Sequence, residues 1–254
     1  MAKAAKPAPR IATVDGAAVA ARSNRVNLFD LAYEQLEARI VSCDLRPGQL
    51  LTIQELQDIT GFGRTPIHQA VNRLAGDTLV LIRPRHGLQI SPVDLSRDRL
   101  LLRLRRDVER FVVQLATERA RATHRSQLLH IARGLRAKRD GMTLDVFNRF
   151  DRALDRLLIA AADEPFLEHT LRPLHTISRR VGWLYHRCVG APESLLETID
   201  HHIAIVEAVA NRRQAEAEAA TDGLIGFMDS MFGVMEREID PTLLDCSFDP
   251  VVVR

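Results

Sequence analysis

The chain has 254 residues, of which 46% are hydrophobic and 27% are charged, a balance that supports a buried core in one or two domains. No apolar run approaches the roughly 18 residues of a membrane helix, and residues 1–25 lack the uninterrupted apolar stretch of a signal peptide. The 3 widely spaced cysteines exclude a disulfide framework and a cysteine-based zinc site, and a net charge of +2 does not by itself indicate a polyanionic partner, so we expect a cytoplasmic protein without membrane contact.

The predicted elements begin after an Ala- and Pro-rich segment, residues 1–25, whose composition indicates a flexible tail. Apolar residues at helical spacing, interrupted by Pro-Gly and Gly-Phe-Gly sequences, predict short helices, and Thr52 is expected to cap the second. These helices cover 28–43, 53–60 and 64–75. Two short apolar runs, 79–82 and 88–90, flank a turn with Pro and Gly, which predicts a β-hairpin. Short helices followed by a hairpin are typical of a winged helix-turn-helix.

From Asp94 to about Glu238 the sequence shows helical periodicity and few strand-like runs. The predicted helices cover 95–121, 124–139, 143–162, 165–189, 193–211 and 213–237. We therefore expect a mainly α protein, in which a winged helix-turn-helix with a small β-wing precedes an all-α bundle. The expected parts are a flexible tail over 1–25, a winged helix-turn-helix domain over 26–93, a helical domain over 94–239 and an irregular C-terminal tail over 240–254.

The first turns of the helix over 64–75 carry the side chains expected to meet DNA, because a helix fits the major groove and its first residues reach base edges. Arg64 has the fork geometry that matches guanine O6 and N7. The hydroxyl of Thr65 and the free N–H groups of the helix start suit a phosphate oxygen. Basic side chains at the hairpin tip would reach the adjacent groove or backbone. The predicted contacts are Arg64, Thr65, His68, Gln69, Arg83, Arg85 and His86.

Three runs of residues carry a resemblance to a known family. They are Leu45-Arg46-Pro47-Gly48-Gln49-Leu50-Leu51, Gly61-Phe62-Gly63-Arg64-Thr65-Pro66-Ile67-His68-Gln69-Ala70-Val71-Asn72-Arg73-Leu74 and Arg85-His86-Gly87. Over residues 28–91 the chain resembles the DNA-binding half of a GntR-type regulator. The resemblance implies that Arg64 and His68 face DNA and that Gly87 lets the wing backbone enter the minor groove. His68 stands where the family usually has Arg, Gly63 where it has Ser and Gln54 where it has a basic residue, so we expect an atypical operator.

The helical half carries a second, looser resemblance. Its matching residues are Arg105 with Val108-Glu109, 151–158, 161–162, 165–167, 202–208 and 215–220. Over residues 95–235 they resemble the ligand-binding FCD domain of the FadR-like branch of the same family. Many such domains hold a metal with one Asp and three His, and the last of these positions falls near Leu224. The resemblance therefore implies a divalent metal site with an incomplete ligand set, Asp151, Asp155 and His202.

The same residues permit other interpretations. Asp151 and Asp155 lie one helical turn apart and can hydrogen-bond an organic effector directly, while Arg105 is free to pair an effector carboxylate. The plainer alternative is a solvated helix face at the two aspartates and a core or interface histidine at His202. The predicted effector-binding residues are Arg105, Asn148, Asp151, Asp155, Arg179 and His202.

These features predict a ligand-responsive transcriptional regulator that binds double-stranded operator DNA as a homodimer, since one short recognition helix gives limited affinity and specificity. The resemblance favours repression as the sense of regulation and a carboxylate or sugar acid as the effector. The sequence holds no recognised catalytic motif, so no catalytic residue is predicted. Two alternatives stay open: a metal-dependent enzyme that uses Asp151, Asp155 and His202, and a ligand-insensitive DNA-binding protein.

Overall fold

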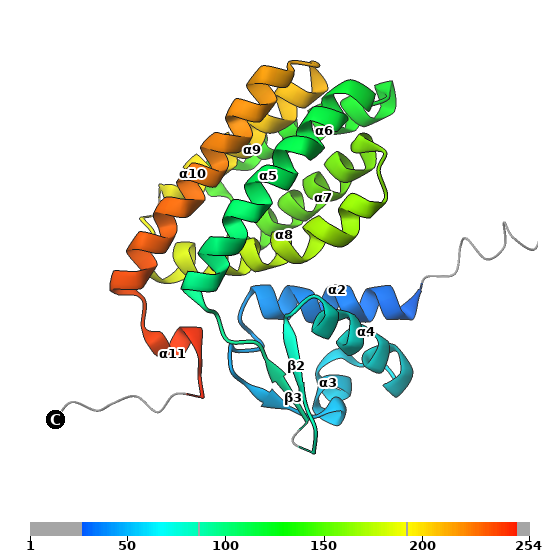
Figure 1. Ribbon diagram of the computed structural model, residues 1–254, viewed down its shortest axis with the longest axis vertical. Helices are drawn as coiled ribbons and strands as arrows, with labels where there is room; N and C mark the ends of the chain where they lie inside the picture. The colour runs from blue at the N-terminus through cyan, green and yellow to red at the C-terminus, as the bar shows by residue number, and fades with distance from the viewer. Residues whose placement is uncertain (1–26, 86, 192, 248–254) are drawn as a thin grey trace, which may run out of the picture.

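The computed structural model describes residues 27–85, 87–191 and 193–247. A small domain of helices and strands lies below a larger helical bundle in the view of Figure 1. The chain passes from the first to the second between β3 (Gly87–Ile90) and α5 (Leu95–Arg119). The predicted fold class, a winged helix-turn-helix followed by an all-α bundle, is confirmed. No helix of the described residues is long and apolar enough to span a membrane.

The N-terminal domain combines short helices with a small sheet. Its described elements are α2 (Leu28–Val41), β1 (Leu50–Leu51), α3 (Ile53–Thr60), α4 (Arg64–Gly76), β2 (Val80–Arg83) and β3. The sheet is antiparallel in the order β1-β3-β2, and Arg83 lies opposite Gly87 at the turn of the hairpin. The sequence does not predict β1, because a strand of 2 residues has no periodicity of its own.

Local signals define both ends of α3. The Glu55 amide donates to the Thr52 hydroxyl at 3.2 Å, and the Thr52 amide donates to the Glu55 carboxylate at 2.7 Å. This capping box satisfies two amides that the helix itself leaves free. Gly61 ends the helix with a φ of +76°, a left-handed conformation that glycine adopts without a Cβ clash. The chain therefore turns at once into α4, as the sequence predicts.

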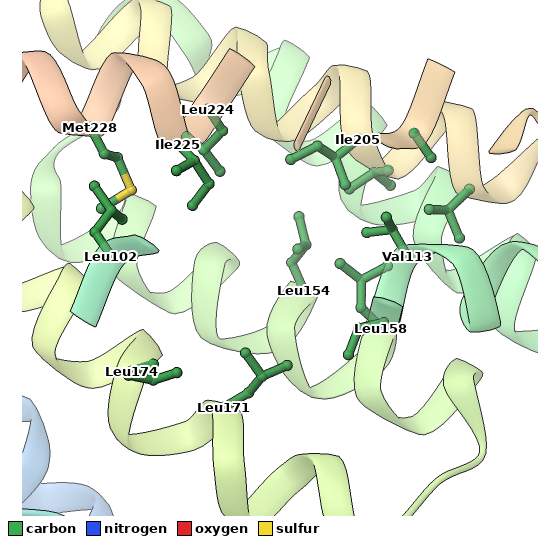
Figure 2. Packing of buried hydrophobic residues seen from close by; sticks show 14 of the residues in the cluster. Leu102, Val113, Leu154, Leu158, Leu171, Leu174, Ile205, Leu224, Ile225 and Met228 are labelled. Carbon is green, nitrogen blue, oxygen red and sulfur yellow. The ribbon is translucent and has the colours of Figure 1, made fainter. Parts of the chain in front are cut away.

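Long antiparallel helices form the bundle. In the described part of the chain they are α5, α6 (Ala122–Lys138), α7 (Leu144–Ala162), α8 (Phe166–Leu184), α9 (Ser194–Ala210) and α10 (Gln214–Glu238), with a 3-10 turn, η1 (Arg139–Gly141), after α6. α5 packs against α7, α8 and α10. Figure 2 shows side chains from different helices in one core, among them Leu102, Leu154, Leu171, Ile205 and Leu224. The apolar stripes that predict the helices are therefore the surfaces that meet in the core.

The end of α8 differs from its prediction. The sequence predicts one helix over 165–189, whereas the α-helix ends at Leu184 and a π-helical turn, η2 (Tyr185–Val189), follows. The Gly190 amide donates to the Tyr185 carbonyl at 2.7 Å, which closes this wider turn. Such turns are rare and often border functional sites.

The described residues after α10 return to the N-terminal domain, where the sequence predicts an irregular tail. They include a short helix, α11 (Pro241–Leu244), visible in red beside the N-terminal domain in Figure 1. The Val93 amide donates to the Leu244 carbonyl, and the Cys246 amide donates to the Pro47 carbonyl, both at 2.8 Å. We call residues 240–247 the C-terminal strap. The expectation of an irregular tail was wrong at 241–244, where α11 forms; the contacts that hold it join residues far apart in the sequence.

α8 also joins the two domains. It packs against α2, and its Ile177 is buried in the core of the N-terminal domain. Nearby, Arg172 Nη2 donates to Asp77 Oδ1 at 3.0 Å, and the Tyr33 hydroxyl donates to Asp77 Oδ2 at 2.9 Å. The two domains therefore share both apolar and ionic contacts along one helix.

Candidate functional site

α4 presents the residues that are predicted to contact DNA. Its outer face carries Arg64, Thr65, His68 and Gln69, all of which are exposed. Ile67 and Val71 are buried on the opposite face, so the helix is divided into a polar side and an apolar side. The N-cap is Gly63, which makes no side-chain hydrogen bond to the helix start. The first amides of α4 therefore have no side-chain acceptor at the cap, an arrangement that suits a phosphate oxygen.

The wing adds basic side chains beside this helix. Arg83 and Arg85 are exposed near the tip of the hairpin. Arg83 Nε and Nη2 donate to Gln89 Oε1 at 3.2 and 2.9 Å, which holds the guanidinium along the strand. His86 lies outside the described residues.

Gly87 has a structural role in the wing. Its φ is +84°, and a Cβ at this position would lie 2.6 Å from the Leu51 carbonyl oxygen. The close approach of β1 therefore requires glycine here whatever the wing contacts. Its role at the minor groove stays a prediction.

A small cavity inside the bundle gathers most of the predicted effector-binding residues. We call it the bundle cavity; its volume is about 40 Å³, room for a few water molecules. Five of the six predicted residues line it: Arg105, Asn148, Asp151, Arg179 and His202. Asp155 does not, since it faces the cleft between the domains. The other lining residues are Leu144, Phe147, Ser178, Gly182, Trp183, His186, Thr198, Leu224, Met228 and Met231.

Asp151 and His202 form a buried ion pair on the cavity wall. His202 Nε2 donates to Asp151 Oδ1 at 2.9 Å, and His202 Nδ1 donates to the Thr198 carbonyl at 2.7 Å. Burial alone would lower the pKa of His202, but the hydrogen bond and the charge of Asp151 outweigh burial and raise it. Burial alone would raise the pKa of Asp151, but His202 and Arg179 hold it well below its usual range. Both contacts therefore favour the charged imidazole, which has a proton on each nitrogen.

Asp155 belongs to a neighbouring group of buried charges. Its Oδ2 accepts a hydrogen bond from Arg179 Nη1 at 2.6 Å and lies 3.1 Å from His175 Nδ1. The other ring nitrogen of His175 lies 2.8 Å from Glu109 Oε2. Burial raises the pKa of Asp155. Burial alone would also raise the pKa of Glu109, but the charges of His175 and Arg105 lower it to about 2.

The predicted metal ligands do not converge. Within the described residues, the one group of three or more acidic, His or Cys side chains whose ligand atoms lie close together is Glu109, Asp155 and His175. The fourth family position, Leu224, contributes an apolar wall. His202 Nε2 and Asp151 Oδ1 lie 2.9 Å apart, whereas Asp155 faces the interdomain cleft and pairs with Arg179 and His175. The set Asp151, Asp155 and His202 is therefore corrected: these residues do not fit the metal that the resemblance implies.

Sequence reasoning misses Glu37 of α2. Its side chain is 3% exposed, pairs with Arg152 Nη2 at 3.1 Å, lies 3.3 Å from Arg179 Nη2 and accepts a hydrogen bond from the Thr176 hydroxyl. Burial alone would raise the pKa of Glu37, but Arg179 and Arg152 lower it. Thr176 lies 139 residues further along the chain, so no local pattern predicts the contact. One signal was present, since Glu37 interrupts the apolar stripe of its helix beside Leu36.

Comparison with known families gives two matches. A family model described as bacterial regulatory proteins, gntR family, matches residues 29–90, and the FCD domain model matches residues 100–227. The HTH-type transcriptional repressor RspR of Escherichia coli (strain K12) is 27% identical over 212 residues, which cover 82% of this chain and 90% of that protein. An HTH-type transcriptional regulator in an unstable DNA locus of Streptomyces ambofaciens is 33% identical over 79 residues, 31% of this chain and 33% of that protein.

Solved structures share the fold. McbR/YncC of E. coli superposes with a TM-score of 0.72 at 16% identity and covers 84% of this chain and 100% of that chain. A putative transcriptional regulator GntR from Rhodococcus sp. RHA1 has a TM-score of 0.60 at 17% identity and covers 80% of this chain and 96% of that chain. The family and the fold are those of transcription regulators and not of enzymes. The exposed face of α4, the bundle cavity and these matches together show that the chain belongs to the GntR family of bacterial regulatory proteins, as a ligand-responsive DNA-binding regulator with an FCD domain.

Proposed function

We propose that the protein is a cytoplasmic repressor that binds operator DNA as a homodimer and responds to a small carboxylate or sugar acid in the bundle cavity. The exposed side chains of Arg64, Thr65, His68 and Gln69 on α4 support the major-groove contact. Arg83 and Arg85 support a contact of the wing with the flanking backbone. The name of the RspR relative, a transcriptional repressor, supports the sense of regulation.

The contacts of Arg105 are the observation that supports a carboxylate as the effector. It is 5% exposed and lines the bundle cavity. Its Nε donates to Glu109 Oε2 at 3.3 Å, and its Nη1 meets the thioether sulfur of Met228 at 3.5 Å. A thioether is a weak acceptor, so the terminal edge of this buried cation is underused within the described residues. A carboxylate binds such an edge through two parallel hydrogen bonds.

The bundle cavity must widen to admit this ligand. Pockets for small molecules are typically on the order of 300–1,000 Å³, against about 40 Å³ here. Met228 and Met231 are unbranched side chains that adapt to new shapes. Their helix, α10, packs on α5 and α9, so displacement of these methionines is passed to the rest of the bundle.

α5 supplies the surface for a second copy of the chain. Leu100, Leu104 and Phe111 are 62%, 50% and 49% exposed. Because they are four and seven residues apart, they share one face of the helix. An exposed apolar face of this kind supports a contact with the same face of a second copy. A two-fold pair then places two α4 helices on half-sites about one DNA turn apart.

The DNA interface is tested with a duplex that the purified protein selects from a random pool. Arg64→Ala is expected to lower the affinity for this duplex about tenfold to 100-fold, since one bidentate base contact contributes about 1–3 kcal/mol. Arg106→Ala, an exposed arginine on α5, is the control and is expected to bind normally. Fluorescence anisotropy measures both, and an unchanged affinity of Arg64→Ala would overturn the interface.

The effector class is tested through Trp183, the only tryptophan in the chain, which lines the bundle cavity. Small carboxylates and sugar acids are screened for a change in its fluorescence and for a rise in Tm, because a ligand of the folded state stabilises by mass action. Arg105→Gln is expected to abolish the response, whereas the exposed Arg110→Gln on the same helix keeps it. A response that survives in Arg105→Gln would contradict the assignment.

A further inference from the structure

Arg179 of α8 is the one described residue that lines both the bundle cavity and the cleft between the domains. This interdomain cleft has a volume of about 610 Å³ and lies between α2 and the helices α7 and α8. The Arg179 side chain is 7% exposed. It therefore forms a wall between the ligand cavity and the DNA-binding domain.

One guanidinium meets carboxylates of both domains. Its Nη1 lies 2.6 Å from Asp155 Oδ2 and 3.5 Å from Asp151 Oδ2, both on α7. Its Nη2 lies 3.3 Å from Glu37 Oε1 on α2 and donates to the Thr176 hydroxyl at the same distance. A guanidinium is planar and permanently charged. It can therefore hold together three buried carboxylates that would otherwise repel one another.

The place of Arg179 explains why the predicted metal set does not fit. Asp151 and Asp155 are the first two positions of that set, and Arg179 Nη1 lies within 3.5 Å of an oxygen of each. The acidic pair thus has a cation supplied by the chain itself. A divalent ion placed between these carboxylates would meet the charge of the guanidinium.

Glu37 depends on the bundle for all its described charged partners. Arg152 and Arg179 pair with its carboxylate, and the Thr176 hydroxyl donates to it. Glu37 is thus a carboxylate of the DNA-binding domain whose charge is compensated from the ligand-binding domain. α2 in turn packs against α4, which carries the DNA contacts. A movement of Arg179 therefore changes the forces on the helix that supports α4.

We propose that Arg179 is a built-in cation that takes the place of a metal between Asp151 and Asp155 and passes ligand binding on to Glu37 of the DNA-binding domain. The second half rests on the proposed function. An anionic ligand in the bundle cavity adds negative charge beside Asp151 and draws the guanidinium away from Glu37. α2 then loses a contact with α8, and the α4 helices of the dimer change their placement on the operator.

Thermal unfolding with manganese ions tests whether Arg179 takes the place of a metal between Asp151 and Asp155. The Tm of the wild type is expected to be unchanged by excess MnCl₂ or EDTA. Arg179→Gln is expected to have a lower Tm, and MnCl₂ restores part of it because carboxylates left without their cation bind a hard divalent ion. Adding Asp151→Asn to Arg179→Gln removes this restoration. A stoichiometric metal in the purified wild type, or an EDTA-sensitive Tm, would overturn the proposal.

A second variant covers the case in which Arg179→Gln does not fold. Arg179→Lys keeps the charge but lacks the fork that spans both domains. It is expected to fold with a Tm between those of the wild type and Arg179→Gln, or below the wild type if the latter is unfolded. A Tm equal to that of the wild type would contradict the bridging role.

A double-mutant cycle on operator affinity tests whether the contact between Arg179 and Glu37 couples the two domains. The probe is the duplex that the wild type selects. Glu37→Gln and Arg179→Gln are each expected to change the affinity at least about fivefold, the lower range of allosteric coupling. The double variant is expected to show no further change, because both substitutions break the same contact. Multiplied effects, or no effect of either variant, would overturn the tie.

The control is an exposed ion pair that also joins α2 to the bundle, but through α7. Glu34 of α2 contacts Arg156 of α7, and their side chains are 38% and 61% exposed. Glu34→Gln and Arg156→Gln are expected to leave operator affinity unchanged; a change equal to that of Glu37→Gln would contradict a specific role for Arg179. If Arg64→Ala leaves DNA binding intact, the proposed function is wrong. The manganese experiment does not depend on DNA binding and still tests whether Arg179 replaces a metal.

Discussion

His202 and Asp151 are 51 residues apart in the chain and meet at 2.9 Å inside the bundle. Their contact converts two positions of a family metal site into an ion pair between side chains. Each partner favours the charged form of the other, which raises the pKa of His202 and lowers that of Asp151. The two charges of this pair thus compensate each other without an added ion.

The free energy of unfolding is expected to fall as the pH rises and His202 loses its proton. Because folding raises its pKa above the usual 6.5, its contribution is fully present below that value and is lost as the pH rises through the folded value. Asp151 behaves oppositely: folding lowers its pKa, so its contribution is present above 3.8 and is lost only as the pH falls through the folded value.

Urea unfolding of the wild type and His202→Gln at several pH values measures this effect. The variant is expected to lose about 3 kcal/mol of unfolding free energy near pH 6, since it leaves Arg179, at 3.5 Å, as the remaining described ion-pair partner of the buried Asp151. The difference between the two proteins should shrink as the pH is raised. A difference that stays constant from acid to alkaline pH would show that His202 is not the titrating partner.

His68→Arg is expected to tighten operator binding and steepen its salt dependence. His68 is exposed on the outer face of α4, where it stands in the place of the usual family arginine. Arginine carries a permanent charge, so an arginine on a phosphate releases about one more counterion. The slope of log affinity against log salt should therefore change by about 0.9. Anisotropy titrations at several salt concentrations measure it, and an unchanged slope would place residue 68 away from the phosphates.

Gly48→Ala is expected to destabilise the protein more than Gly61→Ala. Both glycines have a positive φ, +80° and +76°, so both substitutions carry a similar backbone penalty of about 1 kcal/mol. A Cβ at Gly48 would lie 2.0 Å from Asp245 Oδ1, whereas Gly61 has no atom within 4 Å of that position. Displacing the C-terminal strap adds about 1–2 kcal/mol through its lost hydrogen bonds. Equal losses in denaturant unfolding would show that the strap contributes nothing.

Leu104→Glu with Phe111→Glu is expected to convert the proposed dimer to a monomer, because both side chains lie on the exposed apolar face of α5. Light scattering after gel filtration measures the mass, and operator affinity should fall in parallel. Phe166→Glu on α8, where the phenylalanine is 71% exposed, is the control and should stay dimeric. A wild type that is monomeric would refute the dimer itself.

Elements with local signals are predictable from this sequence. The bounds of α3 follow from Thr52 and Gly61, which act within one turn of the helix ends. β1 and α11 are not predictable in this way, because their backbone partners are distant residues such as Gln89 and Val93. A two-residue strand or a single helical turn gains its stability from those partners and not from its own composition.

In the candidate site, too, some features are predictable from the sequence and others depend on distant partners. The family resemblance, and not helical spacing, groups Arg105, Asp151 and His202, which lie on three different helices and whose side chains line the bundle cavity. The i,i+4 spacing also groups Asp155 with Asp151, but Asp155 pairs with Arg179 and His175 and faces the interdomain cleft. Which of two neighbouring spaces a side chain enters depends on partners from another helix, and no periodicity contains that information.

The core of the DNA-binding domain is completed by Ile177, a residue of the helical bundle. This side chain of α8 is buried among residues of the N-terminal domain. Excising that domain would leave an unfilled hole in its interior, a defect that destabilises cores in proportion to its volume. The two domains are therefore expected to unfold as one cooperative unit with a single melting transition, and a displacement of α8 would reach the interior of the DNA-binding domain itself.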